Sequence, residues 1–374
     1  MSRITRLAGL AALTAGLALP IPAAADITVP CPGIVVDSSA AIIAALQSVG
    51  PGGTVRLEPC TYYLSAPIVI TGTFDGALVG AGMGRTILTT LPDADGIEDV
   101  LMRNWISDLD APGVRGPTLA PTLFHFSLFG DGPSRVAMSN MTVTVTDPRP
   151  AFASARAAWF GDALLAIVTV EGKWVSTDFD EVALKGRHTE WGLGSNASYG
   201  IEMWGELSFW PESGTQRPMV GRHTLTRSLI EGVNTGYNPY EMADSSMMVR
   251  HNRFADLAVD AFDGGDMEAS VLHVSHNLIE LAGAPYGGIW IIDADGALVE
   301  QNRIAGEAAV GITLAAGRGY RVLKNGMSSL VLPPGAPAIV LGPDTADSLV
   351  VGTDPALVLD EGTNNRVLAG KAKR

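Results

Sequence analysis

The feature that most constrains the fold is a repeat in the second half of the chain. Asn252, Asn277, Asn302 and Asn325 follow one another at intervals of 25, 25 and 23 residues, and Ser228 takes the same place 24 residues before Asn252. Each repeat also contains a second short apolar segment: Gly232-Val233, Ala258-Val259, Gly288 to Ile291, Gly311 to Leu314, and Ala338 to Leu341. Units this short leave no room for helices, so they predict strands joined by turns.

A unit of this size cannot bury its apolar face alone. It can do so by stacking on copies of itself, about 4.8 Å apart, as the coils of a parallel β solenoid. The asparagines would then lie at one turn of successive coils and form a ladder of side-chain amides. Leucine-rich repeats have a similar period, but their spaced leucines and helical segment are missing here. The sequence therefore predicts an all-β solenoid with one continuous core.

Composition supports a turn-rich β protein and argues against nucleic-acid binding. The 374 residues include 43 glycines, and 47% of the chain is hydrophobic. The 25 basic residues face 39 acidic ones, for a net charge of -14, and no basic run precedes the last four residues. A surface that follows a phosphate backbone needs such a run, so no nucleic-acid partner is expected.

The first 25 residues have the organisation of a secretory signal peptide. Arg3 and Arg6 precede the apolar stretch 7–19, Pro20 breaks it, and three alanines end at Ala25, after which we expect cleavage. About 13 apolar residues fall short of the ~20 that a spanning helix needs, and no later segment is apolar for long enough. We therefore expect a soluble bacterial protein, secreted or periplasmic, without a membrane span.

Export makes the two cysteines of the chain interpretable. Cys31 and Cys60 are the only ones, and both lie near the mature N-terminus. An oxidising compartment favours their joining, and two distant thiols offer too few ligands for a metal. We predict a structural disulfide.

A short helix is predicted just before the solenoid. Asp37, Ser38 and Ser39 offer N-cap oxygens, apolar residues recur at helical spacing from Ile42 to Val49, and Gly50-Pro51 ends the pattern. Such a helix can cover the open end of a solenoid. The mature domain, 26–374, is thus divided into an N-terminal cap at 26–60 and coils at 61–370, with long loops between about 91 and 220.

The repeat units, together with segments 51–64 and 78–88, carry a family resemblance. The Gly52-Gly53-Thr54-Val55 strand and the Gly80-x-Gly82 turn leading into Thr86-Ile87 resemble the entry into right-handed parallel β-helix proteins of the pectate-lyase-like superfamily. The resemblance covers about 34–90 and 200–370. It implies a single-stranded right-handed parallel β-helix with a short N-terminal capping helix. The polygalacturonase and pectate-lyase active-site motifs are missing, so it implies no particular reaction.

The repeats predict one column of outward side chains. If Ile201, Val233, Val259, Ile289 and Ile312 point inward, period-2 alternation turns the next residue of each outward, and these residues are Glu202, Asn234, Asp260, Trp290 and Thr313. Two coils would separate Glu202 from Asp260 by about 9 to 10 Å, near the upper end of the range for inverting glycosidases. We take Glu202 and Asp260 as candidate catalytic residues, with solvated surface carboxylates as the alternative.

Aromatic and amide side chains near this column are candidate sugar contacts. Trp290 could stack on a sugar ring, Asn234 lies in the column, and Trp204 and Tyr237 are close along the chain. The alternative for Trp290 is burial beneath a loop.

A second acidic group includes Asp256, Asp260, Asp263 and Asp266, with Gly264-Gly265 between them. Converging carboxylates bind calcium, so Asp263 and Asp266 are candidate ligands, with a solvated turn as the alternative. No other cofactor is expected.

Two functions remain open. In the first, an exported enzyme binds a polysaccharide in a loop-walled groove beside the column and cleaves it as a glycoside hydrolase or a lyase. In the second, the protein is a non-catalytic solenoid that binds glycan or has a structural role at the cell surface or in the periplasm.

Overall fold

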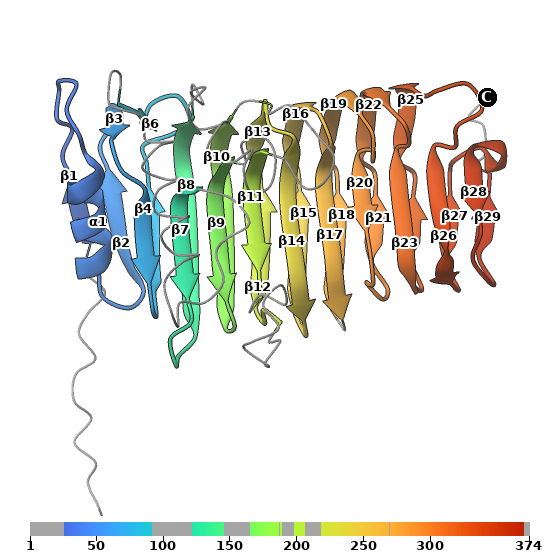
Figure 1. The fold of residues 1–374 in the computed structure, drawn as a ribbon, viewed down its shortest axis with the longest axis horizontal. Coiled ribbons are helices and arrows are strands. Elements are labelled where there is room, and N and C mark those ends of the chain that lie inside the picture. The colour runs from blue at the N-terminus through green and yellow to red at the C-terminus, as the bar shows by residue number, and fades with distance from the viewer. Residues whose placement is uncertain are drawn as a thin grey trace, which may run out of the picture.

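The chain forms a long parallel β solenoid, described by a computed structural model at residues 26–91, 122–145, 165–186, 188, 198–205, 218–268 and 270–369. Every strand pair between the named elements is parallel, and the coils follow one another along a single axis from the N-terminal to the C-terminal end (Figure 1). The fold is the single-stranded right-handed parallel β-helix that the repeats and the resemblance predicted. The predicted signal peptide, residues 1–25, lies outside the described residues.

Each complete coil contributes strands to two sheets, of ten and nineteen strands. The ten-stranded sheet contains β4 (Ile68–Thr71), β7 (Thr122–Leu128), β9 (Leu165–Gly172), β11 (Ser198–Trp204), β14 (Thr235–Ala243), β17 (Asp260–Glu268), β20 (Ile289–Ile291), β23 (Ile312–Arg318), β26 (Ile339–Ala346) and β28 (Val358–Asp360).

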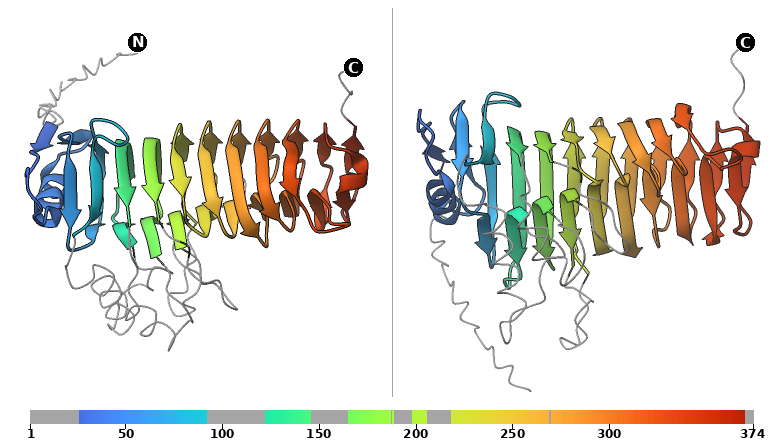
Figure 2. Two further views of the ribbon diagram at one scale, coloured as in Figure 1. Left: turned by 90° about the horizontal axis from the view of Figure 1, so that it is seen from above. Right: turned by 45° about the horizontal axis from the view of Figure 1, so that its top comes forward.

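The nineteen-stranded sheet bends around a corner and has two faces (Figure 2). Its first face contains β1 (Asp26–Val29), β2 (Gly53–Leu57), β5 (Asp75–Val79), β12 (Arg222–Thr226), β15 (Ser246–Arg250), β18 (Val271–Ser275), β21 (Leu298–Glu300), β24 (Arg321–Leu323), β27 (Leu349–Val351) and β29 (Arg366–Leu368). Its second face contains β3 (Thr61–Leu64), β6 (Ile87–Thr90), β13 (Leu229–Glu231), β16 (Arg253–Leu257), β19 (Leu278–Ala284), β22 (Arg303–Ala308) and β25 (Gly326–Val331). β8 (Ser134–Thr144) and β10 (Val175–Lys185) run through both faces.

The core consists of rows of apolar side chains that stack from coil to coil. One such row on the ten-stranded sheet is fully buried and contains Ile201, Tyr237, Phe262, Ile289, Ile312 and Ile339. Because strand residues alternate between the two faces of a sheet, the residue after each member points to the outer face. This alternation creates the row of outward-pointing side chains described below.

The predicted asparagine ladder runs along the corner of the nineteen-stranded sheet. The side-chain amide of Asn252 donates to Oδ1 of Asn277 at 3.0 Å, that of Asn277 to Asn302 at 2.9 Å, and that of Asn302 to Asn325 at 3.0 Å. Each of these amides also donates to a backbone carbonyl of the preceding coil, so its buried polar atoms are paired. The ladder thereby fixes the register of the coils at this corner.

The N-terminal end is closed by the predicted helix and disulfide. Helix α1 (Ser39–Ser48) packs on β1 and β4 and buries Ile42 and Leu46. Oδ1 of Asp37 accepts the backbone N–H of Ser39 at 3.0 Å at the start of the helix. Cys31 and Cys60 form a disulfide with their Cα atoms 5.9 Å apart, as predicted. The paired strands β1 and β2 already lie within the segment that the sequence assigned to the cap.

Candidate functional site

The candidate site is a row of polar and aromatic side chains on the outer face of the ten-stranded sheet. Strand register joins His125 on β7 to Thr169 on β9, and Thr169 to Glu202 on β11. It continues from Glu202 to Asn238 on β14, and from Asp263 on β17 to Trp290 on β20. The side-chain amide of Asn238 donates to Oδ2 of Asp263 at 3.0 Å, which closes the series. We call His125, Thr169, Glu202, Asn238, Asp263 and Trp290 the outer row.

The structure corrects two members of the predicted column. Asn238 and Asp263, and not Asn234 and Asp260, stand between Glu202 and Trp290. The prediction aligned Val233 and Val259 with Ile289, but the inward places belong to Tyr237 and Phe262, because β14 and β17 begin later than those valines. Asn234 is buried before β14, where its Oδ1 accepts from the Ser198 hydroxyl at 2.8 Å. Asp260 is buried three residues before the outer row.

Tyr237, a predicted sugar contact, lies in the core. It occupies the inward row between Ile201 and Phe262 and is fully buried, with its hydroxyl donating to Sδ of Met203 at 3.0 Å. The prediction relied on proximity along the chain and took no account of the inward face that an aromatic side chain fills in a solenoid. A ligand on the outer face cannot touch it.

Glu202 is at the centre of the best-developed part of the site. Its side chain is fully buried, and Oε2 accepts from the Thr169 hydroxyl at 3.2 Å, while Oε1 has no hydrogen-bond partner among the described residues. Burial raises the pKa of Glu202 to about 8, and the Glu171 charge adds to this effect, although a hydrogen bond from the Trp204 side chain opposes it. Glu202 is therefore largely protonated at neutral pH and can donate a proton.

Glu171 lies against His125 beside Glu202. Its Oε2 lies 3.3 Å from Nε2 of His125, and Glu171 is almost completely buried. Sequence reasoning missed both residues, because they lie in the part of the chain where the repeat is weak. The pair places a carboxylate and an imidazole next to the acid of the outer row.

A second acidic centre lies two coils away, at Asp263 and Asp260. Burial raises the pKa of Asp263 to about 7 even though Asn238 donates a hydrogen bond to it. Burial raises the pKa of Asp260 well above its usual range, and the charge of Asp263 adds to the effect. Oδ1 of Asp260 has no hydrogen-bond partner in the described part of the chain. The two carboxyl groups thus hold fewer than two negative charges near neutral pH.

Aromatic rings flank these carboxyl groups. Trp204 stacks on Tyr240, with ring centroids 5.0 Å apart and planes at 21°, and Tyr286 lies 4.6 Å from the ring of Trp290. Trp290 is partly exposed, whereas only 5% of the Trp204 surface is accessible. Trp290 therefore offers the more accessible ring for a sugar, and Trp204 mainly supports Glu202.

The predicted calcium ligands, Asp263 and Asp266, lie in different surroundings. Asp263 accepts from Asn238, whereas Asp266 is exposed within β17 and has a left-handed backbone conformation, with φ of 49°. Among the residues that the structure describes, no group of three or more His, Cys, Asp or Glu side chains is placed to hold a metal ion.

Comparisons with known proteins find only distant matches, all among solved structures. No protein-family model and no curated protein matches the sequence. Among solved structures, the mannuronan C-5 epimerase AlgE4 A-module of Azotobacter vinelandii aligns at 11% identity and a TM-score of 0.36, over 90% of this chain and 93% of that one. DFA-IIIase of Arthrobacter chlorophenolicus A6 aligns at 14% identity and 0.37, over 85% and 90%. A glycoside hydrolase aligns at 11% identity and 0.48, over 93% and 96%. At these values the likeness carries no functional argument.

The helices of the structure were also compared with the requirements for crossing a membrane. Within the described ranges, no helix has both the length and the apolar character needed to cross a bilayer.

Proposed function

We propose that the outer row binds a glycan and hydrolyses one of its glycosidic bonds. The observation that carries this proposal is the placement of Glu202, fully buried, and Asp263, half-buried, in one row, with pKa values raised to about 8 and about 7. Two strand spacings between them correspond to about 9.5 Å at the backbone. Inverting glycosidases hold their two carboxyl groups about 6.5 to 9.5 Å apart, which leaves room for a water molecule.

In this mechanism Glu202 is the general acid. Its proton passes to the oxygen of the leaving sugar as the bond to the anomeric carbon breaks. Asp263, ionised, removes a proton from the water molecule that attacks this carbon from the opposite side. Asn238, hydrogen bonded to Oδ2 of Asp263, orients the base. Burial keeps Glu202 protonated at neutral pH, as a general acid requires, and the hydrogen bond from Asn238 favours the ionised form of Asp263.

A neutral glycan suits the outer row better than a polyuronate. A lyase must offset the charge of the substrate carboxylate, which requires a cation close to the base. The outer row contains neither Lys nor Arg, and the chain carries a net charge of -14. Hydrolysis of an uncharged glycan therefore fits the described residues better than elimination on a uronate, and it requires no calcium.

The second candidate function is glycan binding without cleavage. It is favoured by the aromatic pair Tyr286–Trp290, which resembles a binding platform, and by the hydrogen bond that already engages Asp263. Export fits both functions, since residues 1–25 have the pattern of a signal peptide and the disulfide suits an oxidising compartment. The protein would act outside the cytoplasm.

The two functions are separated by measuring reducing-end release and binding on a panel of neutral glycans. Glu202→Gln and Asp263→Asn should each lower the rate by about 100-fold or more, as loss of an acid or base does. Trp290→Ala should weaken binding of the same glycan. Asp256→Asn, an exposed carboxylate outside the row, is the matched control and should change neither quantity. Glycan binding with no release by the wild type would support the non-catalytic function, and neither binding nor release would overturn both.

A further inference from the structure

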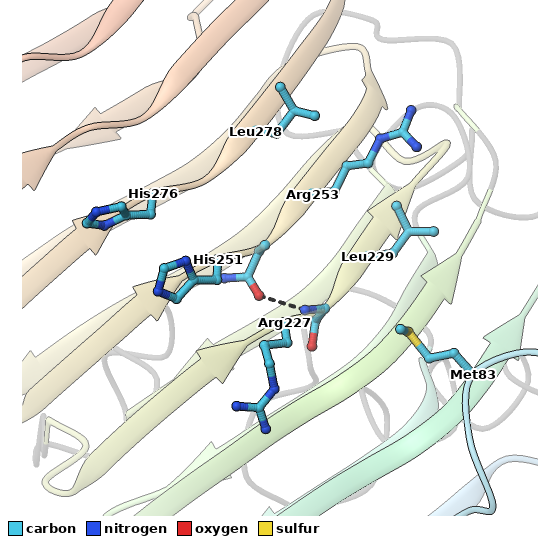
Figure 3. A pocket seen from close by; sticks show the side chains of 9 residues that line it. Met83, Arg227, Leu229, His251, Arg253, His276 and Leu278 are labelled. Carbon is cyan, nitrogen blue, oxygen red and sulfur yellow. Dashed lines mark hydrogen bonds between the residues drawn. The ribbon is translucent and has the colours of Figure 1, made fainter.

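A surface depression lies at the corner of the asparagine ladder, on other strands than the outer row. Its volume is about 430 Å³, and its lining includes Arg227, His251, Arg253 and His276 (Figure 3). Leu229, Leu278 and Met83 complete an apolar part of the same lining. The combination of cationic and apolar side chains differs from the acidic character of the rest of the chain.

The repeat explains why these cations gather. The position before each ladder residue adopts a left-handed conformation, with φ between 50° and 58°, and successive coils place Arg227, His251, His276, Gln301 and Lys324 there. The position after each ladder residue holds Leu229, Arg253, Leu278 and Arg303, which are register partners. None of these nine residues is acidic, although the chain has 39 acidic and 25 basic residues. From Arg227 to Lys324 the corner is thus richer in basic than in acidic side chains, although Glu181 takes the same left-handed place one coil before Arg227.

The basic groups keep donors free for a ligand. Arg253 uses Nη2 to contact Glu280 at 2.9 Å, and Arg227 contacts Asp180 and, through Nε at 3.2 Å, Glu181. A guanidinium has five N–H donors, so these ion pairs leave several available. The side chains of Arg227 and Arg253 are 58% and 54% exposed. The rings of His251 and His276 lie side by side, with centroids 5.0 Å apart.

We propose that this depression binds an anionic group, such as a phosphate, sulfate or carboxylate, carried by a ligand with an apolar face. Arg253 and the two imidazoles donate to the anion, because guanidinium and imidazole N–H groups form short charge-assisted hydrogen bonds with oxyanions. Leu229, Leu278 and Met83 contact the apolar face of the ligand. The proposal is independent of the hydrolase, since none of these residues belongs to the outer row.

The glycine run that borders the depression does not supply the anion contacts. The backbone N–H groups of Gly80 and Gly82 donate to the carbonyls of Ser139 and Asn140, and that of Gly84 donates to the Thr142 hydroxyl. Because these donors are occupied, the run does not form the open amide cradle of a phosphate loop. Its contribution is the side chain of Met83, which is 44% exposed.

The test is a titration of the full-length protein with phosphate, sulfate, glucuronate and uncharged glucose, followed by calorimetry. His251→Asn combined with Arg253→Gln removes one imidazole and one guanidinium, and asparagine tolerates the left-handed conformation at 251. Arg321→Gln, an exposed arginine on β24 outside the depression, is the matched control. We expect at least one anion to bind, with affinity lowered about tenfold or more in the double variant and less than about twofold in the control.

The other possible results identify the kind of anion that binds, or overturn the proposal. Tighter binding of glucuronate than of phosphate and sulfate would assign the site to acidic groups on a glycan, and the reverse order would assign it to free inorganic anions. Equal binding of glucose and glucuronate, equal loss in the control, or no binding of any anion would overturn the proposal. Glycan hydrolysis should be unchanged in the double variant.

Discussion

Burial sets the protonation of Glu202, and with it the chemistry of the outer row. Oε2 of the carboxyl group accepts a hydrogen bond from Thr169 and Oε1 has no partner among the described residues, so the group regains less than the hydration it loses on folding. An ionised carboxylate there lacks compensation, so the neutral form is favoured and the pKa rises to about 8. A residue that is unfavourable for stability at alkaline pH is thereby suited to proton donation.

The linkage between this pKa and folding predicts a pH dependence of stability. A carboxyl group with a raised pKa in the folded state favours folding most below its unfolded pKa of about 4.3, and this contribution is lost as pH rises toward 8. The free energy of unfolding of the wild type should therefore fall between pH 5 and 8 by several kcal/mol more, roughly 4, than that of Glu202→Gln. Urea denaturation at several pH values measures the free energy of unfolding of both proteins. The same pH dependence in both would contradict the raised pKa of Glu202.

The asparagine ladder predicts a large cost for removing one buried amide. Asn277→Ala leaves Nδ2 and the backbone N–H of Asn252 without their acceptor and the Val249 carbonyl without its donor. Unpaired buried groups cost about 1 to 3 kcal/mol each, so we expect at least about 3 kcal/mol of lost stability in chemical denaturation. Gln301→Asn, at an exposed ladder neighbour, should cost less than about 0.5 kcal/mol. Similar losses in both variants would show that the ladder does not stabilise the fold.

At the scale of elements, the helix and the disulfide act together at the N-terminal end. Helix α1 covers the first coils, and the disulfide joins the segment before the helix to the turn before β3. Such closure matters because the first strands of an uncovered solenoid would present free backbone groups and apolar side chains to solvent. The acidic and basic rows of the molecule are built on the coils that this end stabilises.

Reduction of this disulfide should therefore destabilise the protein. A closed loop of this size contributes about 3 to 4 kcal/mol on the chain-entropy model. Thermal unfolding with and without reductant, and of Cys31→Ala combined with Cys60→Ala, should show a lower midpoint in both cases, while the outer row and its glycan binding remain intact at 25 °C. An unchanged midpoint would mean that the disulfide does not stabilise the N-terminal cap.

Elements also explain which parts of the site could be predicted. The asparagines and the Ile289 and Ile312 strands have an unbroken period, so the solenoid, the ladder and the outward positions of Glu202 and Trp290 followed from the sequence. β14 and β17 are longer, and aromatic Tyr237 and Phe262 replace the β-branched residues of their neighbours. The predicted register of these two strands was therefore wrong, and Asp260 was assigned to the outward place that Asp263 occupies. His125 and Glu171 lie on coils without asparagines, where no period identified them.

At the scale of the whole molecule, the solenoid separates two surfaces of different charge. The outer face of the ten-stranded sheet collects carboxyl groups, and the ladder corner collects arginines and histidines (Figure 3). Because every coil repeats the same positions, side chains at equivalent positions of successive coils line up in a row. Such a row suits ligands that are themselves repetitive. The proposed hydrolase and the proposed anion site use this property on different faces.

The dependence of hydrolysis on pH tests the central claim most directly. With a neutral glycan that the wild type cleaves, kcat/KM should rise as Asp263 ionises and fall as Glu202 loses its proton at about pH 8, so the pH profile should be bell-shaped. Glu202→Gln should lose activity by about 100-fold or more and lose the alkaline limb of the profile. Full activity in Glu202→Gln, or an unchanged alkaline limb, would contradict the assignment of Glu202 as the acid.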